Sequence, residues 1–190
     1  MARLALRRED RAVRLPRPRR RRAVLCRRDH QRRDPRRAAV NGGEGGNPPR
    51  VSVLTLKQAV ACIDRGLAKA QGLGFQVAIA VVDEGGHLVA CHRMDGALWI
   101  TPEIARAKAN AAAAFRTTTL DMEDRFSKGS RQLFASNVAS LGDYQLVFGK
   151  GGVPIVDNGQ VIGAVGVSGA VPADNDHAIA EAAAGGKGQP

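Results

Sequence analysis

Residues 75–92 read Phe75-Gln-Val-Ala-Ile-Ala-Val-Val-Asp-Glu-Gly-Gly-His-Leu-Val-Ala-Cys-His92, and this segment indicates how the sheet is built. A short apolar run rich in β-branched residues ends at Asp83-Glu-Gly-Gly86, and a second apolar run resumes at once from His87. Two such runs around a glycine-rich turn are typical of antiparallel strands. The sequence therefore predicts a β-hairpin here and not the strand–helix alternation of a doubly wound fold.

A second group of strands is predicted near the C-terminus. Gln145–Phe148, residues 151–156 and residues 161–168 are apolar runs, and Asn158-Gly159 between the last two is a strong hairpin signal. Together with the first hairpin they predict an antiparallel sheet of about five strands.

The remaining patterns are helical. Thr55-Leu-Lys-Gln58 has the spacing of a capping box and opens an amphipathic helix over about 55–71. Thr101-Pro-Glu103 has the pattern of an N-cap followed by proline at the first helical position, and it opens an alanine-rich helix that reaches about Phe115. A short helix is expected near 131–136, and a final one, capped by Asp174 or Asp176, runs through Ala184. The fold class is therefore α+β, with helices flanking the sheet.

The basic residues are concentrated at the N-terminus. Residues 1–50 hold 17 arginines and five acidic residues, a formal charge of +12, whereas the other 140 residues hold 12 basic and 13 acidic side chains, a charge of −1. We expect 1–50 to be a disordered Arg-rich head with a Gly/Pro linker, followed by one domain over 51–190. The head is read as a nucleic-acid-binding arm, an Arg-rich transit peptide, a tail without a site, or upstream sequence translated because the start is assigned too early.

Composition excludes several classes of protein. No apolar run is long enough for a transmembrane helix, and no signal-peptide pattern is present. Cys26, Cys62 and Cys91 show neither disulfide nor zinc spacing, which favours a cytoplasmic protein. The glycines of 149–152 and 163–169 fit no nucleotide-binding motif, and the near-neutral domain makes nucleic acid an improbable partner.

Five segments in order and spacing resemble the GlcG/HbpS-like family, which includes the C-terminal domain of PduO-type proteins. They are Ala80-Val-Val-Asp-Glu-Gly-Gly-His-Leu88, His92-Arg-Met-Asp-Gly-Ala97, Ala105-Arg-Ala-Lys-Ala109, Gly151-Gly-Val-Pro-Ile155 and Ile162-Gly-Ala-Val-Gly-Val-Ser-Gly169. The resemblance covers about residues 53–184. It implies a profilin-like antiparallel sheet, homo-oligomers such as octamers, and haem binding linked to haem degradation or redox sensing.

Candidate site residues follow from the strand that contains His92. Alternation places Leu88, Ala90, His92 and Met94 on one face and His87, Val89, Cys91 and Arg93 on the other. His92, with apolar neighbours, is the candidate ligand of haem iron and the only metal-binding residue predicted. Arg93 and Lys108 are candidate cations for propionates or a substrate carboxylate. Ordinary solvated side chains remain the alternative for all three residues.

Gly151 and Gly152 are the remaining candidates. They predict either a bend before an edge strand or close approach of backbone to a planar cofactor. Lys108 and Thr117–Thr119 are the next iron ligands to consider if His92 is not one. The small side chains of Ala105, Ala109 and Ala112 allow close helix packing, which the resemblance places at a subunit interface.

Three functions remain open at this stage. The first is a haem-binding protein, with haem as cofactor and a small molecule as further ligand. The second is a catabolic enzyme that acts on a small carboxylate without haem, and the third is a non-catalytic ligand-binding module. Whether the chain is an enzyme, and on what, does not follow from its residues.

Overall fold

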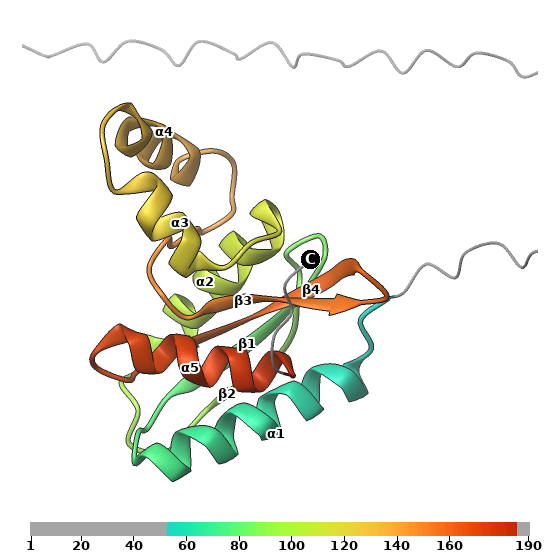
Figure 1. The fold of residues 1–190 in the computed structure, drawn as a ribbon. Coiled ribbons are helices and arrows are strands. Elements are labelled where there is room, and N and C mark those ends of the chain that lie inside the picture. The colour runs from blue at the N-terminus through green and yellow to red at the C-terminus, as the bar shows by residue number, and fades with distance from the viewer. Residues whose placement is uncertain (1–52, 186–190) are drawn as a thin grey trace, which may run out of the picture. The chain divides into compact units, whose positions relative to one another are not determined.

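The computed structural model describes residues 53–185, so the Arg-rich head and the linker predicted over 1–50 lie outside the described residues. The described part contains five helices and four strands, arranged as an antiparallel sheet in the order β2-β1-β4-β3 (Figure 1). In chain order the elements are α1 (Leu56–Leu73), β1 (Ala78–Asp83), β2 (Leu88–Arg93), α2 (Thr101–Phe115), α3 (Thr119–Phe126), α4 (Ser130–Ala139), β3 (Gly152–Asp157), β4 (Gln160–Ser168) and α5 (Ala173–Ala184). No helix among these is both long and apolar enough to cross a bilayer.

The α+β class and the antiparallel sheet are confirmed, but the expected fifth strand is not found among the described residues. Residues 145–148 form no strand, because their polar backbone groups bond to α2 and not to the sheet. The amide of Val147 donates to the carbonyl of Ala107 at 3.2 Å, and Asn110 Nδ2 donates to the carbonyl of Gln145 at 3.2 Å. This segment therefore lies along α2.

Local signals fix the ends of several elements. The predicted capping box is present, with Gln58 N donating to Thr55 Oγ1 at 3.3 Å and Thr55 N donating to Gln58 Oε1 at 2.9 Å. The turn between β3 and β4 is formed by Asn158 and Gly159, both at positive φ, as the hairpin signal requires. The predicted helix near 131–136 is α4, whereas α3 was expected to be irregular.

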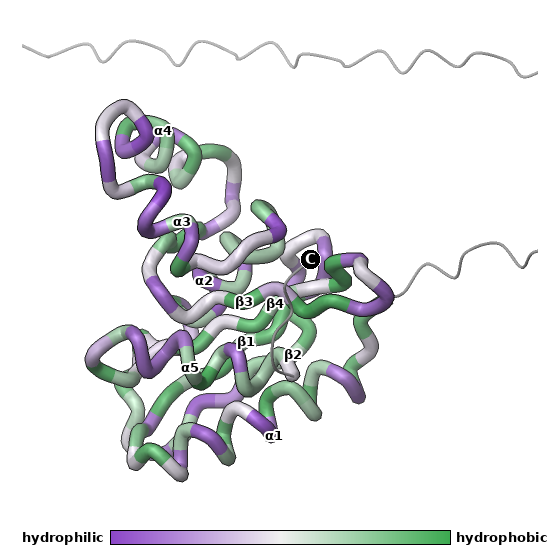
Figure 2. Tube along the Cα trace, viewed as in Figure 1, coloured by the Kyte–Doolittle hydropathy of each residue, from purple (hydrophilic) through white to green (hydrophobic). Residues whose placement is uncertain are grey.

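Three layers form the core, with α1 and α5 on one face of the sheet and α2 on the other (Figure 1). Ile79 and Val81 of β1 pack toward α1 and α5 in the larger hydrophobic cluster. The alternate residues Ala78, Ala80 and Val82 pack toward α2. Both faces of β1 are thus buried, which explains its continuous apolar run (Figure 2).

The α2 side of the sheet is built from alanine and glycine. A Cβ added to Gly166 of β4 would overlap the carbonyl oxygen of Ala105 and would lie 2.7 Å from the amide nitrogen of Ala109. The backbone of α2 therefore lies directly on β4. Ala105, Ala109 and Ala112 are fully buried in this contact, so the interpretation that they form a subunit interface is wrong.

A β-bulge in β2 changes the predicted alternation of its side chains. Ile79 pairs with His92 and Val81 with Ala90, but Val82 pairs with Leu88, so one residue of β2 is extra. Residues that pair directly share a face, which places His92 and Ala90 on the α1 side and Leu88 on the α2 side. The prediction for Leu88 was therefore wrong, whereas His92 and Cys91 lie on opposite faces as expected.

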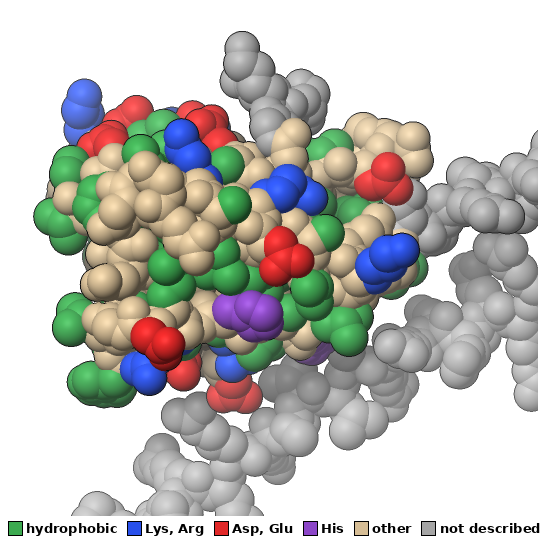
Figure 3. Space-filling view, turned by 90° about the horizontal axis from the view of Figure 1, so that it is seen from below, with side chains coloured by type: hydrophobic (Ala, Val, Ile, Leu, Met, Phe, Trp, Pro, Cys, Tyr) green, Lys and Arg blue, Asp and Glu red, His purple; other side chains and the backbone are tan. Residues whose placement is uncertain are grey.

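The surface agrees with a near-neutral domain. Figure 3 views the domain from below, and hydrophobic, basic and acidic side chains are interspersed on the face that it shows. Among the described residues visible there, no continuous basic area is seen. This face therefore lacks the stripe of lysine and arginine typical of nucleic-acid-binding proteins.

Candidate functional site

A shallow hollow of about 370 Å³ lies along the edge strand β2 and contains two of the predicted site residues. Its lining consists of Leu67, Cys91, His92, Arg93 and Met94. His92 and Arg93 are exposed, and neither forms an ion pair with another residue of the range 53–185. The hollow therefore offers the imidazole of His92 beside the apolar side chains of Leu67 and Met94. Arg93 pairs with Ala78, so its side chain starts on the α2 face of this edge strand.

Lys108, Gly151 and Gly152 lie together in a different, buried part of the fold. Lys108 Nζ donates to Asp176 Oδ2 at 2.8 Å and to the carbonyl of Val167 at 3.0 Å, and both charged side chains are less than a tenth exposed. The other oxygen of Asp176 accepts from the amide of Ala170 at 2.8 Å. Asp176 is thus the partner of a buried lysine, four residues into α5, and not the cap of that helix.

The two glycines make room for this ion pair. A Cβ on Gly151 would lie 2.9 Å from the Cβ of Asp176 and 3.2 Å from Lys108 Nζ. A Cβ on Gly152 would lie 2.5 Å from the Lys108 carbonyl oxygen and 2.7 Å from the Thr119 side chain, whose hydroxyl accepts from the Gly152 amide at 2.7 Å. These contacts give the residues a structural role, and their contact with a cofactor stays a prediction.

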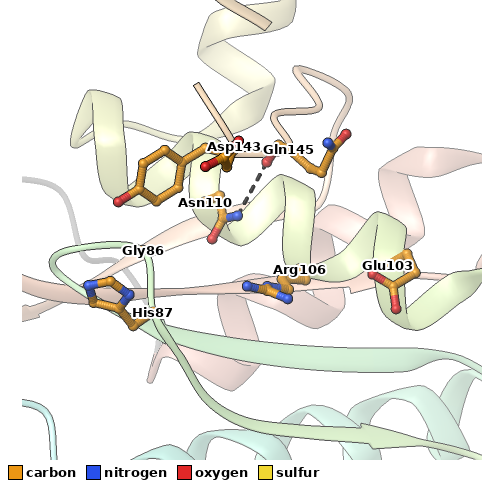
Figure 4. Close-up of a pocket in the computed structure, with 8 residues that line it drawn as sticks. Gly86, His87, Glu103, Arg106, Asn110, Asp143 and Gln145 are labelled. Carbon is orange, nitrogen blue, oxygen red and sulfur yellow. Dashed lines mark hydrogen bonds between the residues drawn. The ribbon is translucent and has the colours of Figure 1, made fainter. Parts of the chain in front are cut away.

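A deeper cleft lies on the α2 side of the sheet and has a polar and an apolar half. The polar half, about 240 Å³, is shown in Figure 4, and the apolar half measures about 430 Å³. Gly86, Asn110 and Tyr144 line both halves. The polar half also has His87, Glu103, Arg106, Asp143 and Gln145, and the apolar half has Ala114, Phe115, Val138, Leu141 and Leu146 among its lining.

Three elements hold the polar half in place. Glu103, Arg106 and Asn110 follow one another at spacings of three and four residues, which puts them on one face of α2. The β1–β2 turn is fixed by Asp83 Oδ1, which accepts from the amides of Gly85 and His87, each at 2.9 Å. The third element is the irregular segment before β3, which the Asn110–Gln145 hydrogen bond ties to α2.

Sequence reasoning missed this cleft. One signal was available, because Asn110 is a polar residue among the alanines of a helix whose small side chains predict close packing, and it is 4% exposed. Asp143 and Tyr144 gave no signal, since nothing local indicates that an irregular segment lies against α2.

The electrostatics near the cleft disfavour thiolate chemistry. Burial raises the pKa of the Cys91 thiol, the Glu103 carboxylate raises it further, and Arg106 lowers it. Burial also raises the pKa of the Cys62 thiol, against the opposing effect of Arg65. Both groups are therefore poor nucleophiles at neutral pH. Within residues 53–185, no three His, Cys, Asp or Glu side chains cluster as a metal site would require.

Comparisons with known proteins point to one family. The sequence model of a family described as haem-degrading protein HbpS-like matches residues 54–185. Protein GlcG of Escherichia coli K12 is 40% identical over 117 residues, which are 61% of this chain and 81% of that protein. Among solved structures, a double mutant of Streptomyces reticuli HbpS superposes with a TM-score of 0.63 at 28% identity, covering 77% of this chain and 95% of HbpS. The PduOC:heme complex superposes with a TM-score of 0.62 at 26% identity, covering 70% and 94%.

Proposed function

Because the chain belongs to the HbpS-like family of haem-degrading proteins, we propose that it binds haem in the hollow along β2. The observation that carries the proposal is the exposed imidazole of His92, in a hollow that the apolar residues Leu67 and Met94 also line. The volume of about 370 Å³ falls within the range of about 300–1,000 Å³ that small-molecule sites occupy.

Each residue of the hollow fits one part of the haem group. A neutral imidazole is a common axial ligand of haem iron, so His92 would bind the iron. Arg93 starts on the other face of this edge strand, and it would bind a propionate that extends past the strand edge. Its guanidinium forms no ion pair with another described residue. Leu67 and Met94 would pack on the ring. Haem held in this way supplies a redox-active iron, and we propose haem degradation or redox sensing in the cytoplasm as its use.

Lys108, Gly151 and Gly152 do not line this hollow. In the proposal they support the fold, through the buried ion pair, and their predicted contact with haem would need a second site. If that second site exists, a variant of Lys108 that keeps the stability of the protein should change the haem spectrum. If it does not exist, such a variant should leave the spectrum unchanged.

Haemin added to the full-length protein is expected to give a shifted, saturable Soret band, because His92 binds the iron and one side of the ring packs against the hollow. His92→Ala should move the band. His87→Ala is the matched control, because its imidazole lines the cleft on the opposite side of the sheet, and the band should stay in place.

Two outcomes would contradict this prediction. Haemin that fails to bind saturably would remove the haem proposal and favour the alternative, an enzyme acting on a small carboxylate or a non-catalytic ligand-binding module. A wild-type band in His92→Ala would place the iron ligand elsewhere.

We also propose that the protein forms homo-oligomers, for which the octamers expected from the family resemblance are one form. The hollow is open on its outer side and β2 is an edge strand, whose unpaired backbone groups can bind a second copy. Light scattering at micromolar concentration should therefore give a mass at least twice the 20.1 kDa of one chain. A 20.1 kDa species at every concentration would rule out this assembly.

A further inference from the structure

The cleft on the α2 side contains a buried hydrogen-bond acceptor without a partner. Asn110 is 4% exposed, and its Oδ1 makes no hydrogen bond with any residue of the described range. Rotating the amide so that its oxygen and nitrogen change places would not satisfy both atoms. Nδ2 now donates to the Gln145 carbonyl oxygen at 3.2 Å, and after the exchange the amide oxygen of Asn110 would face that carbonyl oxygen. Figure 4 shows Oδ1 directed away from Gln145, toward the Gly86 turn. A buried acceptor of this kind destabilises the fold unless a ligand donates to it.

The charged groups of the polar half indicate the rest of the ligand. Asp143 and Glu103 are further acceptors, whereas Arg106 is exposed and forms no ion pair within residues 53–185. Asn110 Oδ1 and Asp143 lie at one end of the polar half and suit an ammonium group, which has three donors and no acceptor, whereas Glu103 lies beyond Arg106 (Figure 4). A guanidinium suits a carboxylate, which it can bind through two parallel hydrogen bonds. The polar half therefore matches a molecule with both groups.

The apolar half indicates a side chain. It continues from Asn110 past Ala114 and Phe115, is also lined by Leu141 and Leu146, and has a volume of about 430 Å³. Burial of an aliphatic or thioether side chain there would be favourable. A molecule that lies across both halves thus has a zwitterionic end and an apolar end.

We propose that this cleft binds a free α-amino acid with an apolar side chain. The ammonium donates to Asn110 Oδ1 and Asp143, the carboxylate binds Arg106, and the side chain lies in the apolar half. A plain carboxylate leaves Asn110 without a donor and meets Asp143 and Glu103, while a plain amine leaves Arg106 unpaired. This site is separate from the hollow at His92, which lies on the other side of the sheet, and it does not depend on haem.

Three matched probes test the proposal by calorimetric titration of the full chain without haem: leucine, 4-methylpentanoate, which lacks the ammonium, and 3-methylbutylamine, which lacks the carboxylate. Leucine is expected to bind with a Kd below about 1 mM. Each analogue should bind about 10- to 100-fold more weakly, because it loses hydrogen bonds to a charged group. The proposal would be overturned if leucine did not bind or if either analogue bound as tightly as leucine. A further analogue, 2-hydroxy-4-methylpentanoate, has a hydroxyl in place of the ammonium, and equally tight binding of this compound would also overturn the proposal.

Two variants connect the probes to residues. Arg106→Gln should weaken the binding of leucine about tenfold or more, because the carboxylate of leucine loses its partner. The affinity for 3-methylbutylamine, which has no carboxylate, should not change. Asn110→Leu should weaken leucine and leave 4-methylpentanoate unchanged. Arg125→Gln, an exposed arginine of α3 that lines neither half of the cleft, is the control and should not alter binding. The assignment of these two residues would be overturned if a variant lost affinity equally for all probes. It would also be overturned if Arg106→Gln bound leucine as tightly as the unchanged protein.

Discussion

Replacing Asp176 by asparagine is expected to lower the free energy of unfolding by about 3–5 kcal/mol, because it leaves the ammonium of Lys108 buried without a counter-charge. The two side chains are 7% and 6% exposed, and the 2.8 Å ion pair joins α2 on one face of the sheet to α5 on the other. Lys108→Met should cost a similar amount, since the carboxylate is then unpaired. Urea denaturation followed by circular dichroism measures both changes.

The exposed ion pair between Lys150 and Asp174 is the matched control. Its nitrogen–oxygen distance is 2.7 Å, but the side chains are 25% and 69% exposed, so water replaces most of the interaction when one partner is lost. Asp174→Asn should leave the urea midpoint unchanged. If Asp176→Asn and Asp174→Asn had equal, small effects, the buried pair would not hold the layers together. The double variant Lys108→Met/Asp176→Leu should lose less than the sum of its single changes.

Replacing Gly166 by alanine is expected to lower the free energy of unfolding by about 3 kcal/mol, at the upper end of the usual overpacking cost. The added methyl group meets the backbone of α2 at Ala105 and Ala109, and backbone cannot rotate away as a side chain can. The whole helix must therefore move off the sheet, which opens space around Ala80, Ala109 and Ala164. The urea midpoint reports the loss.

Gly72→Ala is the control for this substitution. Gly72 lies in α1, and a Cβ there would meet nothing within 4 Å. Alanine is the better helix former, so the stability should stay the same or rise by up to about 1 kcal/mol. An unchanged midpoint in Gly166→Ala would show that α2 does not lie as close to β4 as described.

Elements with local signals could be predicted from the sequence. The capping box at Thr55 and the Asn158–Gly159 turn each depend on neighbouring residues alone, and the structure has both. A helix also starts at Thr101–Pro102, but its N-cap is Ile100 and not Thr101. The order of these helices and strands then predicted the α+β class, and the family resemblance added the profilin-like sheet. These predictions needed no knowledge of which distant residues meet.

Features that depend on distant contacts could not be predicted. Residues 145–148 have the composition of a strand, but their amides and carbonyls bond to α2. The bulge that moves Leu88 to the α2 side follows from the pairing of β1 with β2 and has no signature in β2 itself. Asp176 has the sequence context of a helix cap, and only the fold brings Lys108 to it. The cleft combines a turn, a helix face and an irregular segment, so it appears only in three dimensions.

The two sides of the sheet should differ in the substitutions they tolerate during sequence divergence. On the α1 and α5 side, Ile63, Ile79 and Ile179 have rotamers that can readjust, so exchanges among aliphatic residues should persist there at a cost of about 0.5–1.5 kcal/mol each. On the α2 side, alanine methyl groups and backbone atoms are in direct contact, and these groups have no rotamers that could adjust to a larger side chain. Related sequences should therefore vary among aliphatic residues on the α1 and α5 side. On the α2 side, the helix positions that face β4 should be almost only Gly, Ala or Ser.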